Sequence, residues 1–528
     1  QTAFSQNKVS AFIEKGSVVD GATKLPVEGA FVSFYTGNHT TATDEQGKFS
    51  MKVSAQDNDS LLITAIGYET QKISYDEFIK KYKHKALKIK LISANPMKVI
   101  KLEYPKELFE EWSKKDPLSN YENYLLENKI KVKYFNFNNI KYNNLLTKNN
   151  EYFMYDPIDK VMVKLFNKYN INYFDSPLFL NNYNDLLNYK NIKDKKKNYN
   201  QSDFYKFQRI KYNILIDKNN KPLYDKWSFD THNREKFTKD LKESKIITYN
   251  NKYLNFSNKY INDNFSNSFG IIDNFYYPCT HNDAIKHFKY FIKNKIKYFG
   301  KYQDAISDNI IYGFHSNISA LLNIGLLIPF DIINIIIKYF NKSNNKKEII
   351  NSIEGLIRQI IGWREYMHFI YTFYSDDIKH IDYIKLDNNL PNSWYTGKTE
   401  LELLNNLIIK VQKYAYLHHI ERLMVINNLM YLYNIKFTEI YKWFMICFID
   451  SYDWVMIPNI LMNINSLDSN IKYMTRVYIG SDNYIKKMSN YSNKNDFKII
   501  NKLYWNFIKK NKKILKKDYG LASQVSRI

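Results

Sequence analysis

Two adjacent histidines, followed by an arginine one helical turn later, interrupt an apolar segment of this 528-residue chain. His418 and Arg422 are four residues apart, so they share one face of the expected helix. A guanidinium inside an apolar helix is costly unless a carboxylate pairs with it. Asp450 and Asp453, in the apolar run from Trp443 to Trp454, are the candidate partners. The plainest interpretation is a buried ion pair that joins two core helices.

The elements around this pair are expected to be helices, from about residue 275 to the end of the chain. Thr280 with Asp283 predicts an N-terminal cap, and Thr399 with Glu402 predicts a capping box that opens a later helix. Apolar residues recur at helical spacing on both sides of the histidines. They are Leu403, Leu404, Leu407, Ile408, Val411, Leu423, Met424, Leu429 and Met430.

The composition indicates a large, basic, multidomain protein. The chain is too long for a single core, and 45% of its residues are apolar. The formal charge of +24 indicates a polyanionic partner, nucleic acid first. Lysine, asparagine, isoleucine and tyrosine are abundant throughout, so a biased genome composition is an alternative source of the excess charge.

Cysteine usage and hydropathy bear on the compartment. Cys279 and Cys447 are too few for a disulfide scaffold or a four-thiolate metal site, which favours a reducing compartment. No apolar run of about 18 residues lacks a strongly polar interruption, so we expect no membrane span. The expectation is a cytoplasmic monomer.

Five motifs follow one another in order in the second half of the chain. They are Arg358-Gln-Ile-Ile-Gly-Trp-Arg-Glu-Tyr366, Trp394-Tyr-Thr-Gly397, His418-His-Ile-Glu-Arg-Leu-Met424, Asp450-Ser-Tyr-Asp-Trp454 and Pro458-Asn459. Upstream, the stretches 299–305 and 314–327 belong to the same pattern. Together these motifs resemble the C-terminal flavin-binding domain of the photolyase–cryptochrome superfamily. The branch they resemble most is the photolyase-related bacterial (6-4) photolyases, which carry an iron–sulfur cluster.

This resemblance implies a non-covalent FAD among the C-terminal helices. Hydroxyl and backbone donors would face its phosphates, and Arg422 paired with Asp450 would flank the isoalloxazine. For Ser316 and Ser319, a plain helix cap and turn is the alternative interpretation. The residues implied to bind the cofactor are Ser316, Ser319, Asn323, Gln359, Trp363, Arg364, Glu365, Arg422, Asp450 and Asn459.

The resemblance also implies a lesion pocket and an electron relay. His418 and His419 match the histidine pair of the pocket, where a protonated imidazole can donate to a lesion in damaged DNA. Trp394 or Tyr395, Trp443 and Trp454 match the relay positions. A structural role in the core is the alternative for both sets.

The chain departs from the family at the iron–sulfur cluster. Leu403, Ser492, Asn495 and Lys498 stand where four cysteines are expected, and none can supply a thiolate. We therefore expect no iron–sulfur cluster. The opening strand of the family's antenna domain is also absent, which puts the antenna chromophore site in doubt.

Residues 1–95 follow a different pattern. Short β-rich segments, separated by turn signals, predict a small β-sandwich. The motifs Gly16-Ser-Val-Val-Asp20, Thr43-Asp-Glu-Gln-Gly-Lys-Phe49 and Ile66-Gly-Tyr68 resemble the carboxypeptidase-regulatory-like domain, which is non-catalytic. That domain is typical of exported bacterial proteins, so this segment alone suggests export. The β-rich segments are 16–19, 30–35, 48–53, 60–66 and 87–91.

Three further regions complete the expected organisation. Residues 97–190 alternate strand and helix signals, which predicts a truncated α/β, Rossmann-like domain of the photolyase antenna type. Its strands are expected at 131–137, 151–155 and 171–174, and a helix at 158–169. Residues 191–274 are expected to be an interdomain linker, and residues 275–528 an all-α FAD-binding domain.

The sequence thus predicts a DNA photolyase, a carbon–carbon lyase without its cluster. Reduced FAD would pass an electron to a flipped pyrimidine dimer, a (6-4) photoproduct first. One alternative is a cryptochrome-like photoreceptor or an inactive flavoprotein. Another is an exported surface or assembly protein whose β-sandwich is the functional module.

Overall fold

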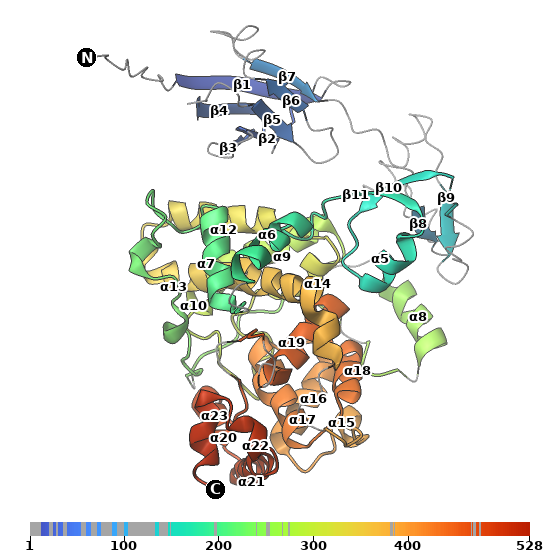
Figure 1. Ribbon diagram of the computed structural model, residues 1–528, viewed down its shortest axis with the longest axis vertical. Coiled ribbons are helices and arrows are strands. Elements are labelled where there is room, and N and C mark those ends of the chain that lie inside the picture. Colours follow the sequence, from blue (N-terminus) through green and yellow to red (C-terminus); the bar gives the residue numbers. More distant parts are fainter. Residues whose placement is uncertain are drawn as a thin grey trace. The chain divides into compact units, whose positions relative to one another are not determined.

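The computed structural model divides the chain into two compact units (Figure 1). The first comprises residues 1–154 and 169–172, and the second residues 155–168 and 173–528. The described residues are 12–20, 25–27, 30–34, 40–53, 60–64, 71–74, 87–91, 100–103, 133–136, 146–147, 149–194, 198–238, 240–249, 254–266, 268–272, 275–380, 384, 386–465, 467, 471–474 and 477–528.

The first unit contains short strands in small sheets. One sheet has the order β4-β1-β7 and another the order β3-β2-β5-β6, while β8 pairs in parallel with β9. The strands are β1 (Phe12–Asp20), β2 (Phe31–Phe34), β3 (Thr40–Ala42), β4 (Lys48–Val53), β5 (Ser60–Thr64), β6 (Gln71–Ser74), β7 (Leu87–Leu91), β8 (Ile100–Glu103) and β9 (Lys133–Asn136). A further pair is β10 (Glu151–Tyr155) with β11 (Asn170–Phe174). The sandwich and the Rossmann-like layer remain predictions.

The turn before β4 shows why the sequence signals of this unit were informative. The Asp44 side chain accepts hydrogen bonds from the backbone N–H groups of Gln46 and Lys48, both at 2.9 Å. Gly47 has a φ of +68°, and a Cβ there would lie 2.5 Å from the Val18 carbonyl oxygen. Only glycine combines that backbone with that close approach.

The second unit is mostly helical. Its helices are α5 (Lys160–Phe166), α6 (Tyr183–Lys193), α7 (Gln201–Lys211), α8 (Leu254–Phe265), α9 (His281–Asn294), α10 (Ile296–Phe299), α11 (Ser319–Asn323), α12 (Pro329–Lys342), α13 (Lys346–Ile357), α14 (Glu365–His380), α15 (Ser393–Thr396), α16 (Glu402–Tyr414), α17 (Asn428–Leu432), α18 (Phe437–Cys447), α19 (Asp453–Asn465), α20 (Asp482–Met488), α21 (Lys494–Lys510), α22 (Lys512–Leu515) and α23 (Tyr519–Val525). Two π-helical turns, η4 (Arg358–Arg364) and η5 (Glu421–Asn427), interrupt this series. Among the residues that the structure describes, no helix has the length and apolar character to span a membrane.

Two apolar clusters form the core of the helical unit. One gathers side chains from α14 to α21 around Trp443, and the other gathers α9, α12 and α13 around Phe288. Helices α14 and α19 pack against each other. Of the nine apolar positions predicted on both sides of the histidines, seven are in the first cluster and Met424 packs at its edge, while Leu423 is half-buried and is not part of it.

Local signals were confirmed in part. Thr280 caps α9 by accepting from the Asp283 N–H at 3.1 Å, as predicted. The capping box at Thr399 and Glu402 is wrong, because α16 starts at Glu402 and Thr399 bonds Asn405 instead. The stretch predicted as a linker contributes α7, whose Phe204 is fully buried in the core, so it is more than a connection.

Candidate functional site

A buried ion pair joins three separate segments of the helical unit. Arg422 Nη1 lies 2.7 Å from Asp450 Oδ1, which confirms the first of the two candidate partners. Ser319 donates to the other carboxylate oxygen at 2.6 Å, and Asn323 donates to the Asp450 backbone carbonyl at 3.0 Å. The guanidinium also lies over the Phe448 ring, 4.1 Å from its centroid. Asp450 therefore connects α11 to the π-helical turn η5.

His418 is a core residue beside this pair. Its ring is stacked on that of His315, with centroids 4.7 Å apart and planes within 12°. The ring nitrogen Nε2 lies 3.6 Å from Glu421, which forms a 2.7 Å ion pair with Lys410. Burial and the neighbouring His315 lower the pKa of His418 well below its usual range. Neutral imidazole is therefore its form at neutral pH.

His419 is the more accessible of the two histidines, with 38% of its side chain exposed. Its Nε2 lies 4.0 Å from Asp304 Oδ1. Removal from water and the positive charge of Arg358 lower the pKa of His419 to about 4. The protonated imidazole expected from the sequence is therefore not the resting form of either histidine. A neutral ring still donates through one N–H.

A network of charged residues lies beside His419 and was missed in the sequence. Arg358 pairs with Glu354 at 3.1 Å and with Asp230 at 3.2 Å, and Arg234 also pairs with Asp230. Asp304 accepts from the Tyr484 hydroxyl at 3.0 Å. The spacing of four residues in 230/234 and 354/358 is the only local signal for these pairs. We call His315, His418, His419 and this network the histidine–arginine cluster.

The π-helical turn η4 carries three of the predicted cofactor residues, and a fourth follows it directly. Arg364 lies between the rings of Phe179 and Trp454, 4.6 Å from each centroid, and burial lowers its pKa to about 10. Gln359 and Trp363 are half-buried. Glu365, which begins α14, is fully buried and accepts from the backbone N–H groups of Leu180 and Asn181, both at 3.1 Å. Glu365 thus anchors the 180–181 segment. π-Helical turns are frequent at functional sites, and η4 and η5 both contribute here.

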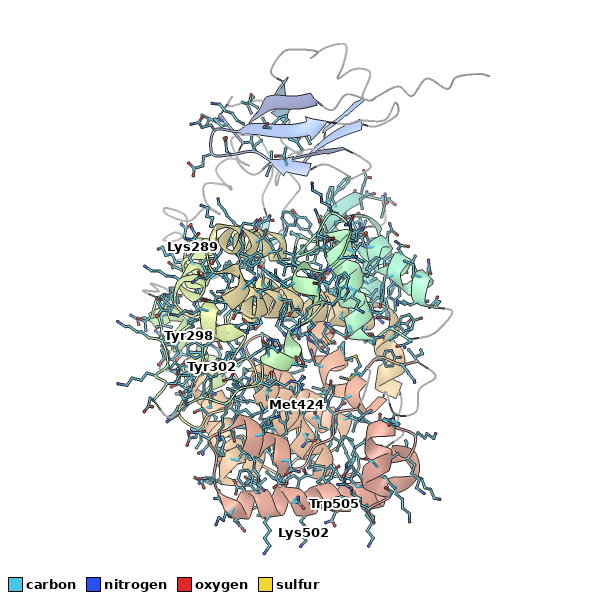
Figure 2. All side chains as sticks on the ribbon, turned by 90° about the vertical axis from the view of Figure 1, so that its left-hand side faces the viewer. Lys289, Tyr298, Tyr302, Met424, Lys502 and Trp505 are labelled. Atoms are coloured by element: carbon cyan, nitrogen blue, oxygen red, sulfur yellow. The ribbon has the colours of Figure 1, made fainter. Side chains whose placement is uncertain are left out.

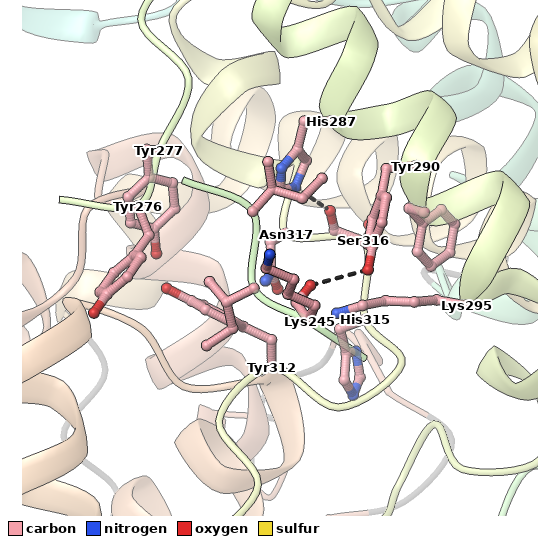
Figure 3. Close-up of a pocket in the computed structure, with 13 residues that line it drawn as sticks. Lys245, Tyr276, Tyr277, His287, Tyr290, Lys295, Tyr312, His315, Ser316 and Asn317 are labelled. Atoms are coloured by element: carbon pink, nitrogen blue, oxygen red, sulfur yellow. Dashed lines mark hydrogen bonds between the residues drawn. The ribbon is translucent and has the colours of Figure 1, made fainter. Parts of the chain in front are cut away.

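A small cavity lies next to Ser316 (Figure 3). It holds about 30 Å³ and is lined by Lys245, His287, Tyr290, Lys295, Ser316 and Asn317, among others. That volume suits about one water molecule. The neighbouring loop is held by Glu243, whose carboxylate accepts from the backbone N–H groups of Ile311, Tyr312 and Gly313 at 2.9, 2.6 and 2.7 Å.

The four predicted relay residues fall into different groups. Trp443 Nε1 donates to the Trp394 carbonyl at 3.1 Å, and its ring centroid lies 5.7 Å from that of Phe448. Phe448 thus contacts both Arg422 and the Trp443 ring, and Trp443 contacts Trp394 through the Trp394 backbone carbonyl. We call Phe448, Trp443 and Trp394 the aromatic row. Tyr395 contacts Phe269 instead, and Trp454 lies against Arg364. Asn459 donates to the Val455 carbonyl within its own helix at 2.7 Å.

Comparisons with known proteins address the origin of this arrangement. Residues 117–277 match the model of the deoxyribodipyrimidine photo-lyase-related protein family, and residues 14–98 match the CarboxypepD_reg-like domain. Residues 117–277 include Asp230, Arg234 and Glu243. They also include five residues that line the cavity, namely Lys245, Ile246, Ile247, Tyr276 and Tyr277.

Individual proteins are also similar in sequence to parts of this chain. The "(6-4) photolyase" of Agrobacterium fabrum is 31% identical over 330 residues, which are 60% of this chain and 64% of that protein. The chain thus spans less than two thirds of the length of that relative. "Uncharacterized protein R853" of Acanthamoeba polyphaga mimivirus is 36% identical over 114 residues, 22% of this chain and 85% of that one.

Part of the chain is also similar to the solved structure of a bacterial class III photolyase from Agrobacterium tumefaciens. It aligns with a TM-score of 0.32 at 14% identity, covering 47% of this chain and 56% of that one.

A hydrogen-bond network lies at the position where no iron–sulfur cluster is expected. Leu403 is buried, and its N–H donates to the buried carboxylate of Asp496 at 2.7 Å. Asn493 donates to Glu402 at 2.6 Å. Both bonds connect α16 with the start of α21. The side chains at the other three positions where the family has cysteines are exposed; these residues are Ser492, Asn495 and Lys498.

Asp304 predicts a specific pH dependence of stability. Burial and the nearby Asp230 charge raise the pKa of Asp304 to about 6, from an ordinary 3.8. Between pH 3.8 and about 6, Asp304 therefore holds a proton in the folded chain that it loses in the unfolded chain. Its contribution to the unfolding free energy thus falls as the pH rises from about 4 to 6. The full effect is about 3 kcal/mol.

The Asp304→Asn variant isolates this contribution, because amide and protonated acid are similar in shape. Denaturant unfolding of both proteins at about pH 4 and about pH 7 gives the change with pH. We expect the variant to gain stability relative to the parent as pH rises. A difference that stays constant across this range would contradict the assignment.

Proposed function

We propose that the protein is a flavin-dependent enzyme that repairs damaged DNA with light, acting first on (6-4) photoproducts. The proposal rests on the buried Arg422–Asp450 pair, held by Ser319 and Asn323 at the junction of α11 and η5. Kinship with the photolyase-related family and with the Agrobacterium fabrum (6-4) photolyase supports it. The net charge of +24 is compatible with a DNA partner.

The donor set of the site suits an FAD molecule. Within the described residues, buried polar atoms without a partner include Nε and Nη1 of Arg364, Oδ1 of Asn317 and the Nδ1 atom of His418. Each such atom costs about 1–3 kcal/mol when it stays unsatisfied. A ligand that carries phosphates, hydroxyls and ring nitrogens would recover that cost. Two of the side chains that would hold it, Ser319 and Arg422, both bond to Asp450.

The volume of the cavity limits this fit. A pocket for a drug-sized ligand needs about 300–1,000 Å³, and the cavity beside Ser316 holds about 30 Å³. The cavity beside Ser316 is thus too small for a dinucleotide. Entry of FAD at this position would require the segment from Lys245 to Ile247, which borders the cavity, to move aside.

Each part of the site then has a separate role. Bound FAD would supply light absorption and electron donation. Ser316 and Ser319 would hold its phosphates, and Arg422 with Asp450 would fix the ring environment. The row from Phe448 to Trp394 would carry electrons toward the surface, and His419 would donate its N–H to the lesion. Phosphate charge near His419 would raise its lowered pKa.

The absorbance spectrum of the purified protein tests this proposal. We expect flavin bands near ~370 and ~450 nm, either as isolated or after incubation with FAD. Illumination should then remove (6-4) lesions from a damaged oligonucleotide, while a dark control leaves them. A protein that stays colourless after incubation with FAD would remove the flavin proposal altogether.

Flavin binding without repair would favour the photoreceptor alternative. Domain boundaries at 95, 190 and 274, a monomeric state and a cytoplasmic location are retained as proposals. The CarboxypepD_reg-like segment is proposed to be non-catalytic, and an exported surface role is the outcome to consider if both flavin and repair are absent.

A further inference from the structure

The positive charge of the chain is concentrated at its C-terminal end. Residues 494–528 contain nine lysines and one arginine against two aspartates, a net charge of +8. The whole chain carries +24, so residues 1–493 contribute only +16. A uniform genomic bias toward lysine does not produce this concentration. One third of the net charge is therefore carried by these 35 residues, which form α21, α22 and α23.

The lysines of α21 form a row on one side of the helix. Lys494, Lys498, Lys502 and Lys509 are exposed and spaced by four, four and seven residues, which places them on one face. The row is about 22 Å long at about 1.5 Å per residue. The opposite face is buried through Phe497, Ile500, Tyr504, Phe507 and Ile508. Figure 2 shows Lys502 projecting away from the helices above it.

The two acidic residues of this region do not neutralise the row. Asp496 is buried and accepts from the Leu403 N–H, and Asp518 caps α23 by accepting from the Leu521 N–H at 3.0 Å. Among the described residues, the four lysines of the row have no carboxylate within ion-pair distance. Lys512, Lys513, Lys516 and Lys517 add further exposed charge just beyond α21. We call Lys494 to Lys517 the lysine surface.

We propose that the lysine surface binds the phosphate backbone of duplex DNA without sequence preference. One DNA strand carries a phosphate about every 3.4 Å along the axis, so the row of α21 can face about six phosphates. Lysines act as point charges on phosphates and carry little information about the bases. The lysine surface shares no residue with the histidine–arginine cluster, so the proposal stands whether or not the chain binds flavin.

A membrane is the less suitable partner for this face. Helices that lie on a membrane bury an apolar face in the lipid. The apolar face of α21 is already covered by the protein core, and Tyr519 and Ile528 are the large apolar side chains exposed within residues 494–528. The surface therefore offers charge without an inserting face.

Binding of the full-length protein to an undamaged duplex in the dark tests the proposal. The test variant combines Lys498→Gln, Lys502→Gln, Lys509→Gln and Lys513→Gln. A matched control combines Lys289→Gln, Lys338→Gln, Lys342→Gln and Lys347→Gln, four exposed lysines of α9, α12 and α13 that change the net charge equally. Fluorescence anisotropy over a range of salt concentrations gives the slope of log K against log salt.

We expect the test variant to lose about 3.6 units of slope, because it removes four lysines and each phosphate contact contributes about 0.9. Its affinity at about 0.1 M salt should fall at least ~10-fold, while the control changes little. A Lys→Arg version of the test variant should keep the slope, which shows that the effect is one of charge. Equal losses in test and control variants, or binding to phosphatidylserine vesicles or an acidic protein without binding to the duplex, would overturn the proposal.

Discussion

Replacing Arg422 by alanine is expected to lower the unfolding free energy by about 3–5 kcal/mol. The change leaves Asp450 buried with only the Ser319 hydroxyl on its carboxylate, and an uncompensated buried charge has a cost of this size. The side chain also loses its bond to the Leu417 carbonyl and its contact with Phe448. Denaturant unfolding followed by circular dichroism measures the loss.

The double variant Arg422→Met with Asp450→Leu separates structure from cofactor binding. Replacing both partners of a buried pair by apolar residues is often neutral for stability. We therefore expect the double variant to recover most of the lost free energy while it fails to take up FAD. If both variants bind flavin as the parent does, the pair is a structural element of the core and does not contact the cofactor.

Replacing His419 by alanine is expected to lower the rate of light-dependent repair by about 10²–10⁴-fold, the usual contribution of a positioned proton donor. The residue is 38% exposed and lies beside Asp304, whereas His418 is buried under His315. His419 is thus the histidine that a lesion can reach. Flavin absorbance should be unchanged, and the lesion assay under illumination measures the rate.

Two other histidines serve as controls for this experiment. His281→Ala removes an exposed imidazole at the start of α9 and should repair as the parent does. His418→Ala removes a buried ring and should act mainly through stability, because its partners are His315 and Glu421. A His419→Ala protein that repairs at the parental rate would reject the lesion-pocket role.

Much of the local structure could be predicted from the sequence. The strand at 48–53 and the Thr280 cap were confirmed because each depends on residues close together in the chain. The pairing of Arg422 with an aspartate was predictable for a different reason, since a guanidinium in an apolar helix requires a partner. The residues alone left the choice between Asp450 and Asp453 open, whereas the resemblance implied Asp450, which is the observed partner.

The capping box at Thr399 shows how a local rule is overridden. Glu402 is engaged by Asn493, and Asp496 accepts from the Leu403 N–H. The residues that satisfy this helix terminus come from α21, about a hundred positions later in the chain. A rule that considers four neighbouring residues contains no information about such a partner.

The sequence by itself determined the helical character of the second unit and the need for a buried counter-charge. These properties depend on residue type and on spacing along one element, which a helix preserves. Only the tertiary structure placed His315 on His418, Asp230 beside Arg358, and Glu243 against the 311–313 backbone. Such contacts join segments that are far apart in the chain, so they depend on how the helices pack, which no local spacing specifies.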